Sequence, residues 1–136
     1  MNGHTPTRHT VFRAIALANR APSVHNTQPW RWRLTAGSVQ LWADRTRRLP
    51  ATDLDGRDLL LSCGAALHHL RVALAAAGWQ STVHHLQDPG DLDHLATLTT
   101  TPHPPTNEDI SLADAIPRRR SDRRRFTSWP VPDQHV

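Results

Sequence analysis

Residues 57–78, with the sequence RDLLLSCGAALHHLRVALAAAG, form the segment that decides the fold class. Apolar side chains recur in this segment at steps of three and four, which predicts a helix with one apolar face. Asp58 in the first turn suits the positive end of the helix dipole, and Gly78 favours a helix end. We therefore expect a long central helix over 57–77. The positions on its apolar face are Leu60, Cys63, Leu67, Leu70 and Leu74.

Alternating segments on both sides of this helix predict a small sheet. Apolar and polar residues alternate over 30–34 and again over 39–43, and the turn residues 36–38 separate them, which is typical of a hairpin. Residues 83–86 suggest a third strand, and residues 95–100, which are rich in Thr and Leu, favour a fourth. The central helix would pack against these strands.

Two shorter helices complete the expected domain, whose fold class is α/β (α+β). Thr10 can cap a helix that runs over 10–20, and Pro22 would end it. A short helix is expected over 110–116, where Pro117 would stop it. We divide the chain into a polar N-terminal segment 1–9, a body 10–117 and an Arg-rich segment and tail 118–136.

Composition indicates the size of the hydrophobic core and the cellular compartment. The chain has 136 residues, of which 38% are hydrophobic, so we expect one domain with a modest core that gains from a partner. The single cysteine, Cys63, excludes an internal disulfide and lies on the apolar face of the central helix. The N-terminus lacks an apolar signal core, and no stretch reaches the ~20 apolar residues that span a bilayer. We expect a cytoplasmic protein with no membrane partner and no metal site.

The positive charge is concentrated in one segment. The formal net charge is +4, and residues 118–125 hold six arginines and one acid, Asp122. The remaining ten arginines and eleven acids nearly cancel. Because a nucleic-acid footprint needs basic residues over a wider surface, nucleic acid is not the expected partner.

The first candidate motif is APSVHNTQPW, at residues 21–30, between the first helix and the hairpin. A loop at such a position can present backbone N–H groups and short polar side chains to a ligand. Its two prolines stiffen it and reduce the ordering cost of binding. The residue types alone are more typical of a rigid turn whose Ser and Asn side chains cap neighbouring backbone.

The second candidate motif is RRRSDRRRF, at residues 118–126. Arg119, Ser121 and Arg123 are spaced by two, so they point the same way in an extended segment. Two guanidinium forks and a hydroxyl on one side can clamp a phosphate group. By charge pattern alone, such a run is more often a solvated or nucleic-acid-contacting segment.

Together the two motifs resemble those of the flavin-binding nitroreductase family. The loop APSxxNxQPW is similar to the family's flavin loop, and RRSDRRRF is similar to its phosphate motif, Arg-x-Ser-x-Arg followed by an aromatic residue. The order of the motifs, loop first, looks like the actinobacterial Acg-like subgroup, in which one long chain carries two nitroreductase-like halves. The resemblance extends over residues 10–134 and includes the long central segment.

The resemblance implies the roles of particular residues toward FMN. Gln28 and Trp30 would support the loop. The residues that would bind the flavin phosphate are Arg119, Ser121 and Arg123. The residues that would line the ribityl chain or the ring from the other half are Pro22, Ser23, Val24, His25 and Asn26. No catalytic side chain is implied, since the flavin itself carries the chemistry.

The resemblance also implies an activity and a difference in length. Members of the family pass electrons from NAD(P)H through FMN to a nitro- or quinone-like acceptor. Chains of the subgroup are more than twice as long, so we expect a nitroreductase-like fold cut to its first half. Such an oxidoreductase would be weakly active or inactive, with its pocket completed by a homo-oligomer or by the missing second half. The alternative is a non-catalytic module that holds flavin or another anionic partner with the Arg-rich tail.

Overall fold

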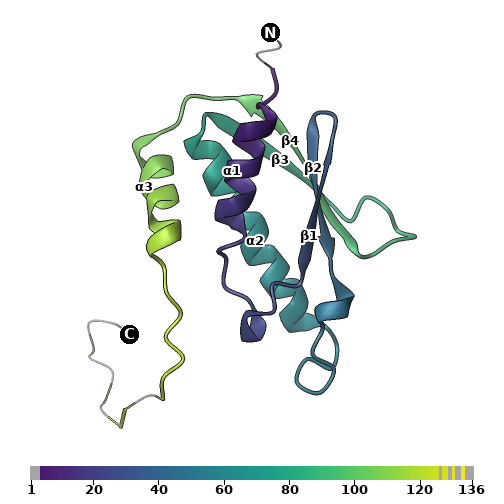
Figure 1. The fold of residues 1–136 in the computed structure, drawn as a ribbon, viewed down its shortest axis with the longest axis vertical. Helices are drawn as coiled ribbons and strands as arrows, with labels where there is room; N and C mark the ends of the chain where they lie inside the picture. Colours follow the sequence, from purple (N-terminus) through teal and green to yellow (C-terminus); the bar gives the residue numbers. More distant parts are fainter. Residues whose placement is uncertain (1–3, 126, 129, 131–132, 134–136) are drawn as a thin grey trace.

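The computed structural model shows a four-stranded antiparallel sheet with helices packed against one face (Figure 1). The structure describes residues 4–125, 127–128, 130 and 133. Strands follow the spatial order β1-β2-β4-β3, so β4 pairs with both β2 and β3. The helices are α1 (Arg8–Ala18), α2 (Arg57–Ala76) and α3 (Asn107–Ala115), and the strands are β1 (Trp30–Thr35), β2 (Ser38–Ala43), β3 (Trp79–His85) and β4 (His94–Pro102).

The long helix α2 is confirmed, although its apolar face is shifted at the N-terminal end. Leu59 is only 1% exposed, whereas Leu60, which the sequence pattern placed on the buried face, is 44% exposed. Three consecutive leucines, residues 59–61, lie in the first turns of the helix, so spacing alone could not decide which of them faces inward. Cys63, Leu70 and Leu74 are buried as predicted.

Helix α1 begins and ends earlier than the sequence predicted. Its N-cap is Thr7, whose hydroxyl oxygen accepts a hydrogen bond from the Thr10 amide at 3.1 Å, so the prediction that Thr10 caps the helix was wrong. The helix ends at Ala18, and Pro22 lies beyond it and does not terminate it. Both threonines are good capping residues, so residue type alone does not indicate which of them begins the helix.

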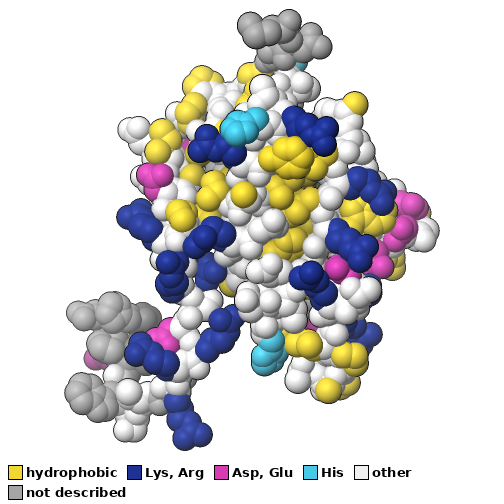
Figure 2. Space-filling model, in the orientation of Figure 1, with side chains coloured by type: hydrophobic (Ala, Val, Ile, Leu, Met, Phe, Trp, Pro, Cys, Tyr) yellow, Lys and Arg dark blue, Asp and Glu magenta, His cyan; other side chains and the backbone are white. Residues whose placement is uncertain are grey.

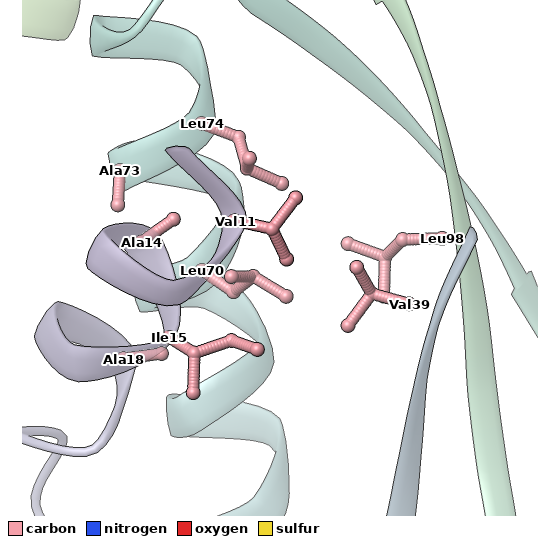
Figure 3. Close-up of a cluster of buried hydrophobic side chains, with 9 residues drawn as sticks. All are labelled: Val11, Ala14, Ile15, Ala18, Val39, Leu70, Ala73, Leu74 and Leu98. Carbon is pink, nitrogen blue, oxygen red and sulfur yellow. The ribbon is translucent and has the colours of Figure 1, made fainter. Parts of the chain in front are cut away.

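The main core joins the two long helices to the middle strands. Figure 3 shows Val39 of β2 and Leu98 of β4 pointing from the sheet toward side chains of α1 and α2. Ala14 and Ala18 let α1 approach α2 closely, because alanine adds little bulk between helices. The buried members of this cluster are Val11, Ala14, Ile15, Ala18, Val39, Leu70, Ala73, Leu74 and Leu98.

The hairpin is confirmed, and the other two strands are longer than predicted. In β1 and β2, Leu34 pairs with Val39 and Thr35 pairs with Ser38, and the turn between them places Gly37 at a φ of 80°. Positive φ is accessible to glycine at little cost, which suits this tight turn. Strand β3 starts four residues before the predicted segment 83–86 and ends at His85, one residue short of it, whereas β4 extends beyond 95–100 at both ends.

Helix α3 is attached to the side of α2 and leads into the Arg-rich segment (Figure 1). Its start is a capping box, in which Thr106 accepts from the Asp109 amide at 3.1 Å and Asp109 accepts from the Thr106 amide at 2.8 Å. None of its residues is buried, but Ile116, directly after it, is only 5% exposed. The expected helix over 110–116 therefore exists but starts earlier, at Asn107.

Helix α2 is long and apolar enough to span a membrane by length and composition alone. The sequence pattern predicted no membrane-spanning stretch in any part of the chain. The apolar side chains of α2 have another explanation in this fold, because they pack against α1 and the sheet. A buried core helix satisfies the same test as a membrane span, so this property indicates little about location.

Candidate functional site

The two sequence motifs line the same hollow, of about 440 Å³. The end of α1 and the loop after it form one side, and the Arg-rich segment forms the other. Its lining residues are Asn19, Arg20, Ala21, Pro22, Asn26, Gln28, Arg119, Arg120, Ser121 and Arg123.

The hollow is strongly cationic. Four arginines line it, and neither Asp nor Glu is among the lining residues. Figure 2 shows arginine side chains gathered where the tail leaves the body of the molecule. A concave surface with charges of one sign concentrates field lines and attracts a ligand of the opposite sign. The hollow is therefore suited to an anion.

Hydrogen bonds between Arg20 and the tail connect the two sides of the hollow. Arg119 donates from Nη2 to the backbone oxygen of Arg20 at 2.9 Å, and Arg20 donates from its own Nη2 to the oxygen of Pro117 at 3.1 Å. Buried Ile116 anchors the same turn. The tail is thus attached to the end of α1 by side-chain and backbone groups of both segments.

Arg119 retains donor capacity after making these contacts. Its Nη1 donates to the Ser121 hydroxyl at 2.9 Å, which fixes the guanidinium plane. Its Nε is buried and has no hydrogen-bond partner within the part of the chain that the structure describes. Buried donors are nearly always paired in folded proteins, so this Nε is a natural donor to a bound acceptor.

Most backbone amides of the loop that carries the first motif already donate to partners within the protein. The Val24 amide donates to the Ser62 hydroxyl at 2.9 Å, and the Gln28 amide donates to the Ser23 hydroxyl at 3.0 Å. The amides of Asn26 and Thr27 also donate to backbone oxygens of this turn. The expectation that the loop offers its N–H groups to a ligand is therefore wrong for these four residues. What the loop presents to the hollow is side chains.

Left-handed backbone turns those side chains into place. His25, Asn26 and Gln28 have φ values of 46°, 55° and 48°, a region that non-glycine residues rarely adopt. Asn26 and Gln28 line the hollow. Such conformations cluster at ligand-binding sites and persist only where the surrounding structure enforces them.

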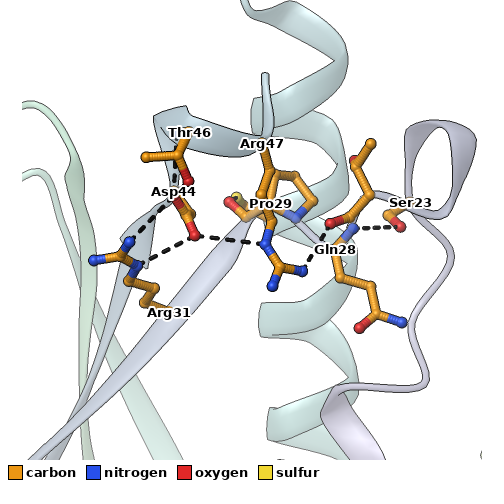
Figure 4. Close-up of polar contacts among 9 residues, drawn as sticks. Ser23, Gln28, Pro29, Arg31, Asp44, Thr46 and Arg47 are labelled. Atoms are coloured by element: carbon orange, nitrogen blue, oxygen red, sulfur yellow. Dashed lines mark hydrogen bonds and ion pairs between the residues drawn. The ribbon is translucent and has the colours of Figure 1, made fainter. Parts of the chain in front are cut away.

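Asp44 and Arg47 hold the loop from the end of β2 (Figure 4). Arg47, in the short 3₁₀ helix η2 (Arg45–Arg47), donates from Nη1 to the Thr27 oxygen at 3.1 Å. Its Nε lies 3.6 Å from an Asp44 carboxylate oxygen, and the Asp44 amide donates to the Pro29 oxygen at 2.9 Å. The carboxylate thus connects the arginine to the sheet while the backbone fixes the end of the loop.

The carboxyl group of Asp44 is buried and ionised. Its pKa is lowered, chiefly by a hydrogen bond from the Thr46 side chain and, with burial acting in the opposite direction, by a further bond from Arg31. Arg31 Nε lies 3.2 Å from this carboxylate. The group serves the structure of the loop and does not face the hollow.

The tryptophans and the cysteine near the loop have packing roles. Trp30 and Trp32 both donate from their indole nitrogens to the Asn19 side-chain oxygen, each at 2.9 Å. Cys63 donates from Sγ to the Pro29 oxygen at 3.2 Å, and burial raises the pKa of its thiol to about 12. Since only the thiolate is a good nucleophile, this residue stays a core side chain.

The structure brings together some of the predicted site residues and not others. Ser23 is buried beneath the loop, Val24 is anchored to α2, and exposed His25 does not line the hollow. Phe126 lies outside the described residues. The predicted residues that do line the hollow are Pro22, Asn26, Arg119, Ser121 and Arg123.

Sequence reasoning missed other contributors. Asn19, Arg20 and Arg120 line the hollow, and Ser62 supports the loop from α2. Arg20 and Asn19 directly precede the first motif, and this proximity is a signal that could have found them. Ser62 carries no such signal, because its role depends on the packing of α2 beneath the loop.

Another hollow, of about 380 Å³, lies beside the start of α1 and the β1–β2 turn. Its lining includes the core side chains of Val11, Leu74 and Leu98 and also Arg8. Neither sequence motif contributes to it.

Curated relatives match nearly the whole chain. A Mycobacterium tuberculosis protein named "Putative NAD(P)H nitroreductase" is 54% identical over 132 residues, which cover 97% of this chain and 38% of that protein. Another from the same organism, named "Putative NAD(P)H nitroreductase acg", is 46% identical over 125 residues, covering 91% of this chain and 38% of that protein. The chain therefore spans less than half the length of these relatives. No family model matches it.

Solved structures show the same fold at low identity. A nitroreductase family protein from Streptococcus pneumoniae has a TM-score of 0.59 and 16% identity, covering 99% of this chain and 90% of that one. A Clostridium acetobutylicum structure described as an NADH oxidase has a TM-score of 0.59 and 13% identity, covering 78% of this chain and 81% of that one. With its fold and its extended similarity to Acg and its relatives, the chain belongs to the nitroreductase family and corresponds to the N-terminal part of the Acg-like proteins.

Proposed function

We propose that the chain binds the phosphate end of FMN in the cationic hollow, as the flavin-binding part of an NAD(P)H nitroreductase-like oxidoreductase. The observation that carries the proposal is the shared location of the two motifs. Arg119, Ser121 and Arg123 line an acid-free hollow together with Pro22 and Asn26, although the motifs are far apart in the chain.

The groups in the hollow fit a phosphate dianion. Guanidinium forks bind phosphate oxygens in pairs, and the Arg123 side chain, which lines the hollow, can supply such a fork. The Nε of Arg119, which has no partner among the described residues, can add a single donor. The Ser121 hydroxyl already orients Arg119 and can add a further hydrogen bond. Arg20 adds positive charge at the same end. The dianion would thus be held by charge and by directed hydrogen bonds.

The opposite wall fits the polyol chain of the cofactor. The amide side chains of Asn26 and Gln28 carry both donors and acceptors, as hydroxyl groups require. Ser23 and Val24 contribute by holding the loop and not by touching the ligand. His25 is exposed and does not line the hollow, so it would meet a bound flavin only outside the phosphate end.

The rest of the activity belongs to the whole oxidoreductase. A bound flavin takes up a hydride from NAD(P)H and passes the electrons to a nitro- or quinone-like acceptor. The residues of this chain hold and orient the phosphate and the polyol. Because the relatives are more than twice as long, we infer that the ring is covered by a second copy or by a second half of the same kind.

The contacts of the tail argue against a free polybasic arm as the alternative. Arg119 donates to the backbone oxygen of Arg20, and Arg20 donates to the oxygen of Pro117, so the tail is attached to the body by contacts between distant segments. These contacts favour a built site over a solvated run. Titration with FMN and riboflavin distinguishes this site from a module that holds an anion without flavin chemistry.

Titration with FMN and with riboflavin tests the proposal. Arg123→Ala should weaken FMN binding by about 1.5–3 kcal/mol, roughly ten- to a hundredfold, because a hydrogen bond to a charged group is lost. Arg125→Ala is the matched control, since this exposed arginine of the same segment does not line the hollow. Riboflavin, which has no phosphate, should bind much more weakly than FMN and respond little to Arg123→Ala.

Two results would count against FMN binding. Equal losses in Arg123→Ala and Arg125→Ala, both disappearing in high salt, would indicate diffuse attraction of any anion. Equal affinity for FMN and riboflavin would show that the phosphate is not the recognised group.

A further inference from the structure

The loop beneath the hollow is held in an unfavourable conformation. Three residues between 25 and 28 have left-handed backbone, and none of them is glycine. Such backbone relaxes to ordinary values unless contacts from elsewhere prevent it. The contacts that prevent it therefore determine where the Asn26 and Gln28 side chains lie.

One of these contacts comes from the central helix. Ser62 of α2 is 5% exposed, and its hydroxyl oxygen accepts the Val24 amide at 2.9 Å. The same hydroxyl donates to the Asp58 oxygen at 2.7 Å, so its proton is committed to the helix and its oxygen must face the loop. The hydroxyl thus connects a rigid helix to the first residue of the strained turn.

A serine at this position is unexpected for α2 itself. Serine lowers helix stability relative to alanine, and its neighbours on the buried face are Leu59 and Cys63. Alanine would suit both the helix and the core. The hydroxyl serves the loop, since the Val24 amide is the partner it satisfies outside the helix.

We propose that Ser62 is a positioning residue of the hollow, which fixes the loop at Val24 and thereby sets the side chains of Asn26 and Gln28 toward Ser121 and Arg123. The role in ligand binding rests on the proposed function above. The hold on the loop does not, because it follows from the contacts of Ser62 alone.

Ser62→Ala tests this with two measurements on the full chain. Amide hydrogen exchange at Val24, Asn26 and Gln28 should become about tenfold faster, as expected for the loss of one hydrogen bond, while exchange at buried core amides is unchanged. FMN affinity should fall by roughly three- to tenfold, and the melting temperature should fall only moderately, because the higher helix propensity of alanine offsets part of the lost hydrogen bond. The matched control is Ser111→Ala, an exposed serine of α3.

Each alternative result overturns the assignment in a different way. Unchanged exchange in the loop would show that Ser62 does not hold it. Faster exchange in the loop and core together would show a general structural role. A loosened loop with unchanged FMN affinity would show that its position does not matter to the ligand. If the unaltered chain binds no FMN, the proposed function fails, and exchange still decides whether Ser62 holds the loop.

Discussion

Arg119 donates a hydrogen bond to the backbone oxygen of Arg20, 2.9 Å away and 99 positions earlier in the chain. This contact places the Arg-rich segment against the end of α1, where the loop of the first motif, residues 21–30, begins. The side chain of Arg20 completes the connection by donating to Pro117. The candidate site therefore depends on a few hydrogen bonds between distant segments, and it should be sensitive to the shape of the groups involved as well as to their charge.

Arg119→Lys should separate shape from charge. Lysine keeps the positive charge but lacks the planar fork that reaches Ser121 and Arg20 together. We expect FMN affinity to fall at least about tenfold, as for the loss of a charge-assisted hydrogen bond, in an equilibrium titration at fixed ionic strength. Arg125→Lys is the control and should have no effect. An Arg119→Lys variant that binds FMN normally would mean that charge alone suffices.

Asp44→Asn should destabilise the fold and reveal a pH dependence. Asp44 is 7% exposed and accepts hydrogen bonds from Thr46 and Arg31. Replacing it leaves the arginines without their counter-charge, and we expect a loss of about 1–3 kcal/mol in urea unfolding at pH 7. Asp93→Asn is the matched control, because its pair with Arg45 is exposed and should contribute no more than about 1 kcal/mol.

The sign of the pH dependence follows from the lowered pKa of Asp44. A carboxyl group with a folded pKa below its ordinary value of 3.8 contributes stability above that value and loses it as the pH falls through the folded pKa. The difference between the unaltered chain and Asp44→Asn should therefore shrink below about pH 4. A difference that stays constant down to pH 2 would show that the carboxylate charge is not involved.

Much of the fold could be predicted because apolar residues recur at regular spacing in its helices and strands. The steps of three and four over α2 and the alternation in β1 and β2 reflect geometry that local sequence encodes directly. Where the sequence is degenerate, the prediction failed. The run Leu59, Leu60 and Leu61 does not indicate which leucine faces inward, and Thr7 and Thr10 cap a helix equally well.

The candidate site was predictable only in part. The residue types of the Arg-rich motif indicated a phosphate-binding role and those of the loop a ligand-binding role, but the proximity of the two motifs results from the path of the whole chain. The amides of the loop bond to Ser62 and Ser23 and not to a ligand, a fact that depends on which helix lies beneath the loop. Spacing along a sequence carries no information about such contacts.

Leu70→Ala should test the core that supports both walls of the site. Leu70 is fully buried between α1 and the sheet, and its truncation leaves a cavity that close-packed neighbours cannot fill. We expect a loss of about 2–5 kcal/mol in unfolding free energy by denaturant titration. Leu61→Ala, on the same helix but 62% exposed, should change it by no more than about 0.5 kcal/mol. Similar losses for both would place the helix in the wrong register.

Gln28→Gly should weaken FMN binding without lowering the stability of the fold. Gln28 has a φ of 48°, which glycine adopts freely, so the substitution removes about 1 kcal/mol of backbone strain. The greater freedom of glycine in the unfolded chain offsets part of this gain, and we expect a melting temperature that is equal or slightly higher. The side-chain amide that lines the hollow is lost at the same time, so FMN affinity should fall by roughly three- to tenfold. A variant that loses stability as well as affinity would contradict the prediction, because it would show that the glutamine side chain holds the loop together and that its φ stores no strain.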